Sequence, residues 1–121
     1  MLKEEMPGEA ALSKRHILVL GTTDTKGKEL LFLKEQIKRR QADAFIIDVS
    51  MGKEPFFEAE VGPAEIARLG GMDIDEVRLS DDRNKITEVM ERGAIEKVKQ
   101  IHSAGEVGAI MAVGGVTMAL F

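Results

Sequence analysis

Cysteine, tryptophan and tyrosine are absent from this 121-residue chain, and phenylalanine occurs five times. Without cysteine the chain can form no disulfide, no thiolate metal site and no cysteine nucleophile. The scarcity of aromatic rings argues against a platform for single-stranded nucleic acid, which needs exposed rings on which bases stack. The core must therefore be built mainly from isoleucine, leucine, valine, alanine and methionine.

Blocks of one charge and long apolar runs are missing as well. The net charge is -4 and the charges of both signs are interspersed, so there is no basic block for DNA or an anionic membrane. No apolar run approaches the roughly 20 residues of a membrane-spanning helix. The first residues also lack the apolar region of a secretory signal. We therefore expect a cytoplasmic protein with neither a membrane nor a DNA partner.

Short apolar segments alternate with amphipathic ones along the chain. Three segments are predicted as parallel strands buried on both faces: 17–20, 44–49 and 108–113. Helices are predicted at 26–40, at 63–69, from Asp73 onward and at 81–104. Strands that alternate with helices indicate βαβ units. The pattern predicts an α/β fold, namely a three-layer, Rossmann-like domain with a short parallel sheet.

The predicted helices have apolar faces and recognisable ends. Leu30, Leu33 and Ile37 share one face of the first helix. In the longest helix, Ser80 is the expected N-cap and Gly105 the expected end. The core face of that helix is expected to comprise Ile86, Val89, Met90, Gly93, Ala94, Val98 and Ile101.

The domain organisation follows from the two ends of the chain. Residues 1–14 are polar, mixed in charge and broken by Pro7-Gly8, which predicts a flexible tail. Residues 15–121 are predicted to be the N-terminal part of a Rossmann-like nucleotide-binding domain. Three strands make a thin sheet, and the chain stops in the apolar segment 118–121. We therefore expect an incomplete domain, or one whose missing half comes from a partner.

The segment that follows the first strand is the strongest candidate for a ligand site, because ligands of such sheets bind beyond the carboxyl ends of the strands. Its glycines permit a tight backbone, its threonines supply hydroxyls, its lysine supplies a cation, and the helix that follows presents free N–H groups to an anion. Its aspartate can orient a ligand hydroxyl, hold a metal or cap the helix. The residues are Gly21, Thr22, Thr23, Asp24, Thr25, Lys26 and Gly27.

This segment differs from a P-loop. Five residues separate Gly21 from Gly27, and Lys28 is followed by Glu29 instead of a serine or threonine. An ordinary P-loop NTPase is excluded, because the hydroxyl that binds magnesium is missing. The segment predicts a phosphate-bearing small molecule, and a capped strand-to-helix turn without a ligand is the alternative.

Two further segments follow predicted strands and belong to the same edge. Asp48 ends the second strand, where an acidic residue either binds ribose hydroxyls or caps the next turn. Gly114, Gly115 and Thr117 follow the third strand. They can bring backbone N–H groups and a hydroxyl to a phosphate, or they can serve close strand-to-helix packing.

The remaining polar residues suggest no chemistry. His16 and His102 have no metal-binding spacing, and we interpret both as structural or solvated. The acidic residues between 73 and 82 are interpreted as a solvated, helix-capping face, so no metal site is predicted. No serine lies in a nucleophile elbow. Catalytic residues therefore stay unassigned.

The glycine-rich segment carries a resemblance to a known family. The sequence is similar to the ATP-binding domain family typified by the tomato mosaic virus resistance protein, in which a strand is followed by G-T-x-D-T-K-G-x-E. The similarity runs over residues 17–121. It comprises residues 21–29, Ile47-Asp48-Val49, Asp82-Arg83, residues 90–94 and Gly114-Gly115.

This resemblance implies nucleotide binding by the N-terminal domain, with ATP as the ligand, with or without magnesium, often within a dimer. Members of that family are longer and contain two Rossmann-like halves, so this chain would be the first part of the first half. Two other hypotheses stay open. One is an enzyme acting on a phosphorylated or carboxylated metabolite, with Asp24 or Lys26 in acid–base work. The other is a non-catalytic oligomerisation domain.

Overall fold

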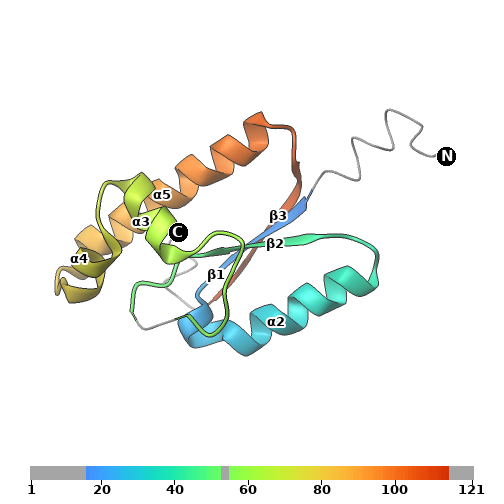
Figure 1. The fold of residues 1–121 in the computed structure, drawn as a ribbon, viewed down its shortest axis with the longest axis horizontal. Helices are drawn as coiled ribbons and strands as arrows, with labels where there is room; N and C mark the ends of the chain where they lie inside the picture. Colours follow the sequence, from blue (N-terminus) through green and yellow to red (C-terminus); the bar gives the residue numbers. More distant parts are fainter. Residues whose placement is uncertain (1–15, 53–54, 115–121) are drawn as a thin grey trace.

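The computed structural model describes residues 16–52 and 55–114. The predicted tail at 1–14 and the predicted site residues Gly115 and Thr117 lie outside these ranges. Figure 1 shows the described elements, which alternate between strands and helices as expected. Their bounds are β1 His16–Gly21, α2 Thr23–Arg39, β2 Ala44–Asp48, α3 Pro63–Gly70, α4 Ile74–Leu79, α5 Arg83–Ser103 and β3 Val107–Val113.

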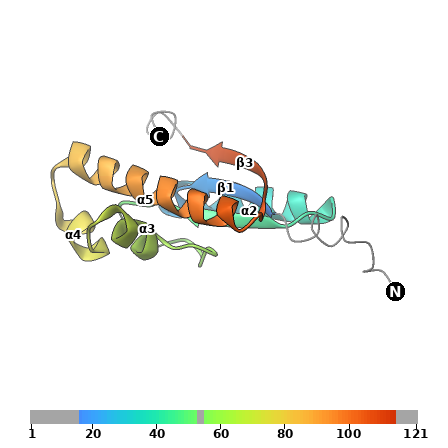
Figure 2. The ribbon, with the colours of Figure 1, turned by 90° about the horizontal axis from the view of Figure 1, so that it is seen from above.

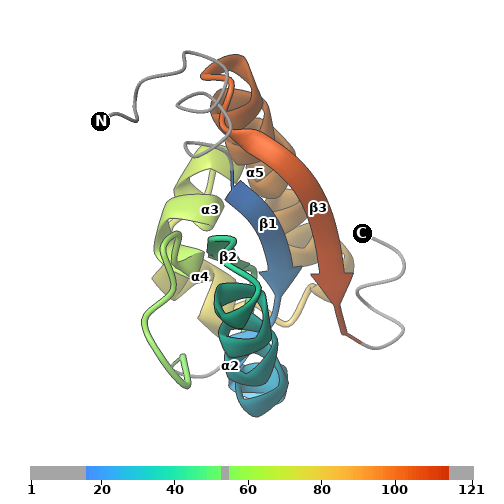
Figure 3. The same ribbon diagram turned by 90° about the vertical axis from the view of Figure 1, so that its right-hand side faces the viewer.

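The strands form one three-stranded parallel sheet in the order β2-β1-β3, seen from one end in Figure 3. β1 is the central strand, and its Leu18 and Val19 are fully buried, one toward each face of the sheet. Its last residue, Gly21, is in register with Asp48 of β2 and with Val113 of β3. The carboxyl ends of all three strands therefore meet at one edge of the sheet.

Helices cover the two faces of the sheet, as Figure 1 shows. Alternate residues of a strand point to opposite faces, and the core is divided accordingly. On one face Val19 and Ile46 pack with Leu30 and Ile37 of α2. On the other face the cluster comprises Leu18, Ile47, Ile66 of α3 and several residues of α5, among them Ile86 and Met90. The predicted α/β fold with a parallel sheet is confirmed.

Helices α3 and α5 cross at two glycines. A Cβ atom added to Gly93 would lie 1.9 Å from the carbonyl oxygen of Ile66, and one added to Gly70 would lie 1.9 Å from that of Val89. Any side chain at either position would therefore collide with the backbone of the other helix. The prediction that Gly93 lies on the core face is confirmed. Because it has no side chain, Gly93 lets α3 and α5 approach each other closely.

The ends of the helices differ from the predictions in detail. α2 begins at Thr23 instead of Lys26, and Lys26 itself has a non-helical backbone (φ -123°, ψ 27°) that kinks the helix. The cap of α5 is Asp82, whose carboxylate accepts a hydrogen bond of 3.2 Å from the N–H of Lys85. The expectation that Ser80 caps this helix is wrong, because Ser80 Oγ accepts the N–H of Asp82 instead. None of the described helices is both long and apolar enough to cross a membrane.

β3 differs most from its prediction. It is present, but residues 108–112 are exposed, including Ile110 at 55% and Met111 at 41%. The expectation of a third buried strand is wrong because β3 is an edge strand, as Figure 2 shows. Among the described elements only β1 pairs with it. Within β3 only the two end residues, Val107 and Val113, pack against the core clusters, and both are half-buried.

The opposite edge of the sheet is partly closed. The segment after β2 returns alongside it, so that the N–H of Val61 donates to the carbonyl of Ile46 at 3.1 Å and the N–H of Asp48 donates to the carbonyl of Val61 at 2.9 Å. Oε1 of Glu60 accepts the N–H of Ile46 at 2.7 Å. The two edges are therefore unequal, because side-chain and backbone acceptors occupy the β2 edge while the β3 edge is open and apolar.

Candidate functional site

Three loops meet at the carboxyl edge of the sheet. They begin after Gly21, after Asp48 and after Val113, residues that the strand register places side by side. The strand order reverses at β1, with β2 on one side and β3 on the other. In doubly wound sheets this reversal marks the crevice that receives a ligand. The structure therefore brings the ends of the three strands together at the expected edge, with Gly21 and Asp48 in register.

A buried carboxylate holds two of these loops together. Asp48 Oδ2 accepts the hydroxyl of Thr23 at 2.6 Å, and Asp48 Oδ1 accepts the N–H of Thr23 at 3.1 Å. Oδ1 also accepts the hydroxyl of Ser50 at 2.6 Å and its N–H at 3.1 Å. All three residues are at least 98% buried. We call Thr23, Asp48 and Ser50 the Asp48 clamp.

The first turn of α2 uses its N–H groups within the protein. The N–H of Asp24 donates to Ser50 Oγ at 3.2 Å. The N–H groups of Thr25 and Lys26 both donate to the carbonyl of Thr22, at 3.2 and 2.7 Å. With Thr23 held by Asp48, the first N–H groups of the helix all have protein acceptors. The free N–H groups that the sequence predicted are not free at these residues, and an anion here must be held by side chains.

Side chains with suitable chemistry line the outside of this turn. The hydroxyls of Thr22 and Thr25 lie 2.6 Å apart on the exposed side. Lys26 is half-buried, and it forms no ion pair within residues 16–52 and 55–114. Asp24 is half-buried too, close to Gly52. Hydroxyls and an unpaired ammonium group can bind a phosphate through charge-assisted hydrogen bonds.

Both glycines of the loop also have a packing role. A Cβ at Gly21 would lie 2.8 Å from a methyl group of Leu30 and 3.2 Å from the carbonyl oxygen of Val113. A Cβ at Gly27 would lie 2.5 Å from the side chain of Phe56. Since internal packing explains these glycines, they cannot serve as evidence for a ligand. Gly114 is exposed beside Val113, whereas Gly115 and Thr117 lie outside the described residues.

Sequence reasoning missed two residues of this edge. Ser50 belongs to the Asp48 clamp, and the spacing Asp48-x-Ser50 is typical of an Asx turn, in which an aspartate accepts the N–H two residues ahead. This spacing could have predicted from the sequence that Ser50 contacts Asp48. Phe56 packs on Gly27 and its N–H donates to Thr23 Oγ1 at 3.3 Å. Phe56 lies in an irregular loop and no sequence pattern marks it.

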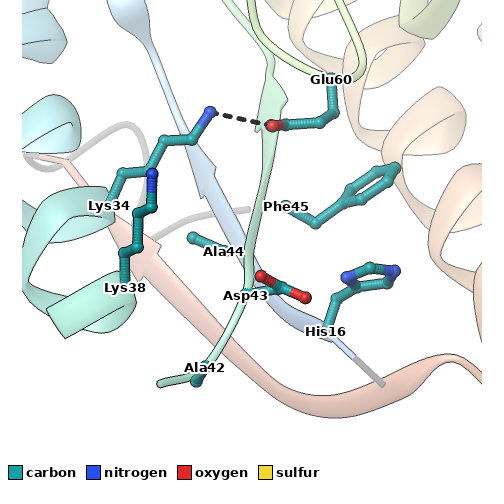
Figure 4. A pocket seen from close by; sticks show the side chains of 8 residues that line it. All are labelled: His16, Lys34, Lys38, Ala42, Asp43, Ala44, Phe45 and Glu60. Carbon is teal, nitrogen blue, oxygen red and sulfur yellow. Dashed lines mark hydrogen bonds and ion pairs between the residues drawn. The ribbon is translucent and has the colours of Figure 1, made fainter. Parts of the chain in front are cut away.

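A cavity of about 400 Å³ lies at the opposite, amino end of the sheet, and Figure 4 shows its lining. His16 opens β1 there and contacts Phe45, with the ring centroids 5.3 Å apart. Lys34 Nζ lies 2.9 Å from Glu60 Oε2. Burial alone would raise the pKa of Glu60, but the hydrogen bonds from Lys34 and from the N–H of Ile46 hold it below its ordinary value. Lys34 therefore pairs with the same carboxylate that accepts the N–H of Ile46 at the β2 edge, and we interpret this ion pair as structural.

The other polar candidates are structural. Asp73 and Glu76 form a capping box at the start of α4, and Asp82 caps α5. His102 is exposed in the last turn of α5. In the part of the chain that the structure describes, no group of three or more histidine or acidic residues is placed to hold a metal ion.

The described residues form a Rossmann-like α/β domain whose loops gather at the carboxyl edge of a parallel sheet. The chain belongs to the UPF0261 family, because the model of the N-terminal domain of this uncharacterised protein family matches residues 15–120.

Individual relatives agree with this assignment. A UPF0261 protein of Clostridium tetani is 32% identical over 101 residues, which are 84% of this chain and 25% of the relative. UPF0261 proteins of Brucella suis and Brucella melitensis are 33% and 32% identical over 99 residues, which are 82% of this chain and 24% of each relative. The chain thus spans about a quarter of the length of these relatives. No solved structure matches it.

These matches correct the family suggested by the glycine-rich motif. The resemblance to the ATP-binding domain family of the tomato mosaic virus resistance protein is wrong, because the family model and the relatives are all UPF0261. The glycine-rich motif and the four shorter matching segments were too small a basis for a family assignment. The UPF0261 description names no function, so any function must be argued from the site itself.

Proposed function

We propose that this domain binds a nucleotide, with ATP as the first candidate, at the loop Gly21–Gly27. The observation that carries the proposal is the position of this loop. It follows the central strand at the point where the strand order reverses, and it offers the hydroxyls of Thr22 and Thr25 and the ammonium group of Lys26. This is where doubly wound sheets receive phosphorylated ligands.

Each residue has a distinct part in this proposal. Lys26 neutralises phosphate charge, and one of the two threonine hydroxyls donates a hydrogen bond to a phosphate oxygen while the other donates to that first hydroxyl. Asp48 fixes the position of the loop through Thr23 and Ser50. Direct contact between Asp48 and a ribose hydroxyl, which the sequence suggested, requires one of these hydrogen bonds to be exchanged for one to the ligand.

The experiment is a binding titration of ATP, with and without magnesium, followed by calorimetry or by thermal stabilisation. Ligand binding to the native state raises the melting temperature. Lys26→Ala should weaken binding about tenfold or more, because it removes a charge-assisted hydrogen bond. Lys28→Ala is the matched control: it removes the same charge from an exposed position two residues further on and should have little effect.

The outcome is decisive in both directions. Binding that Lys26→Ala weakens and Lys28→Ala leaves intact supports the site. The absence of binding by any nucleotide, both to this chain and to the longer Clostridium tetani relative, contradicts the proposal and leaves a capped turn without a ligand.

The open edge at β3 favours a second function, assembly with another copy of the chain. β3 carries no charged residue from Val107 to Val113, so two copies can pair there without repulsion. Two such strands related by a two-fold axis would run antiparallel and present the same surface to each other. The dimer suggested at the sequence level is therefore proposed to form at β3. Sedimentation of the chain at high concentration tests it, and a clean monomer would count against it.

A further inference from the structure

Phe56 occupies an unusual place at the carboxyl edge of the sheet. Its N–H donates to Thr23 Oγ1 at 3.3 Å, which ties it to the Asp48 clamp. Its Cβ, Cγ and Cδ2 atoms all lie 2.5 Å from the position that a Cβ of Gly27 would take. The side chain therefore rests directly on the backbone of Gly27, in the first turns of α2.

This contact leaves about half of Phe56 exposed. Phe56 is 54% exposed, although its backbone is held in place. The next residue behaves differently, because Phe57 is packed against the core cluster beneath α2. A large apolar side chain that is anchored but exposed presents a surface on which another flat group can be buried.

The position of the ring fits the base of the proposed nucleotide. The phosphates are assigned to the loop after β1, and Phe56 lies in the loop that follows β2, the neighbouring strand. In doubly wound sheets a nucleotide extends from the first loop along the carboxyl edge. Phe56 also rests on Gly27, the residue that follows Lys26, so a ligand held at Lys26 lies next to the residue on which the ring packs.

We propose that the ring of Phe56 stacks on the base of the bound nucleotide, an inference that rests on the proposed nucleotide binding. A phenylalanine ring forms no hydrogen bonds with the base edges. Every base has a π-face, so stacking alone tolerates different bases. The inference therefore predicts little discrimination between bases: ATP and GTP should bind with affinities within a few fold of each other, and a base should strengthen binding over phosphates alone.

The absence of tryptophan and tyrosine from the chain gives this inference a direct probe. Phe56→Trp introduces a fluorophore at the ring position, and no other indole or phenol contributes to the signal. Phe32→Trp is the matched control, because Phe32 is 66% exposed on α2. ATP and GTP should quench the emission of Phe56→Trp by stacking, and they should leave that of Phe32→Trp unchanged.

A second measurement compares affinities by calorimetry, with inorganic tripolyphosphate as the ligand that lacks a base. Phe56→Ala should weaken ATP binding between about 5-fold and 100-fold and leave tripolyphosphate binding unchanged. Circular dichroism confirms that the variant folds. Failure of both ATP and tripolyphosphate to bind the wild-type chain overturns the proposed function and the stacking together. If ATP binds but Phe56→Ala leaves its affinity intact, or weakens both ligands equally, only the stacking is overturned.

Discussion

The hydroxyl of Thr23 donates a hydrogen bond of 2.6 Å to Oδ2 of Asp48, which joins the first turn of α2 to the end of β2. The two residues are 25 positions apart in the sequence and both are buried. Ser50 completes the arrangement from the other side of the carboxylate. The geometry of the proposed phosphate loop therefore depends on Asp48, the last residue of a different strand.

Asp48→Ala should lower the free energy of unfolding by about 3 kcal/mol, because it leaves the donors of Thr23 and Ser50 buried without acceptors. Urea denaturation followed by circular dichroism measures the change. Asp43→Ala is the control: Asp43 is exposed just before β2, and its removal should change the stability by less than about 0.5 kcal/mol. Equal effects of the two substitutions would contradict a structural role for the Asp48 clamp.

Gly93→Ala should destabilise the protein by at least about 2 kcal/mol through overpacking. Its Cβ would lie 1.9 Å from the backbone oxygen of Ile66, so α3 and α5 would have to move apart. Gly62→Ala is matched to it, since a Cβ there meets nothing within 4 Å, and it should shift the stability by less than about 1 kcal/mol. Thermal and urea unfolding measure the stabilities of the two variants against that of the wild type. Similar melting temperatures would show that the helices do not cross as described.

Glu60→Gln should reduce stability at neutral pH and have a smaller effect in acid. Hydrogen bonds from Lys34 and from the N–H of Ile46 hold the pKa of Glu60 below its ordinary value of 4.5, against the opposing effect of burial. A carboxyl group with a lowered pKa stabilises the fold above its unfolded-state pKa, and this contribution is lost as the pH falls through the folded-state pKa. The difference between wild type and variant should therefore shrink below about pH 4.5.

Urea midpoints measured from pH 7 to pH 3 test this, with Glu58→Gln as the control at an exposed position in the same segment. The control should show no such narrowing. A wild-type advantage that stays constant over the whole pH range would mean that the ion pair with Lys34 contributes nothing to it.

The strands were predictable from short continuous apolar runs, and the helices from apolar residues at helical spacing. The run Ile17 to Leu20 and the spacing from Ile86 to Ile101 predicted β1 and α5 from local sequence alone. The exposure of β3 was not predictable in this way. Its residues are as apolar as those of β1, and only the strand order shows that β1 is central while β3 is at an edge.

The sequence predicted which loops lie at the carboxyl edge of the sheet, but it did not predict the hydrogen bonds between them. The rule that parallel strands bring their loops to one edge sufficed to group Gly21 with Asp48. Whether the first N–H groups of α2 are free depends on Ser50 and Asp48, which are brought there by the sheet register. Phe56 reaches Gly27 across 29 positions of sequence, a contact that no local pattern encodes.

The open edge leads to a final prediction, on Ile110. The register with Leu18 places Ile110 on the α5 face of the sheet, yet it is 55% exposed. A lysine on an edge strand disfavours pairing with another strand, because its charge would have to be desolvated between the two copies. In sedimentation equilibrium at high concentration, the wild-type chain should form a dimer, and Ile110→Lys should shift it to the monomer.

Leu79→Lys, at an 87% exposed leucine on α4, should leave the dimer intact. A monomeric wild type, or a dimer lost only in Leu79→Lys, would show that β3 is not the contact surface. The same measurement separates assembly from ligand binding, because Ile110 lies mid-strand, away from the loop at Lys26.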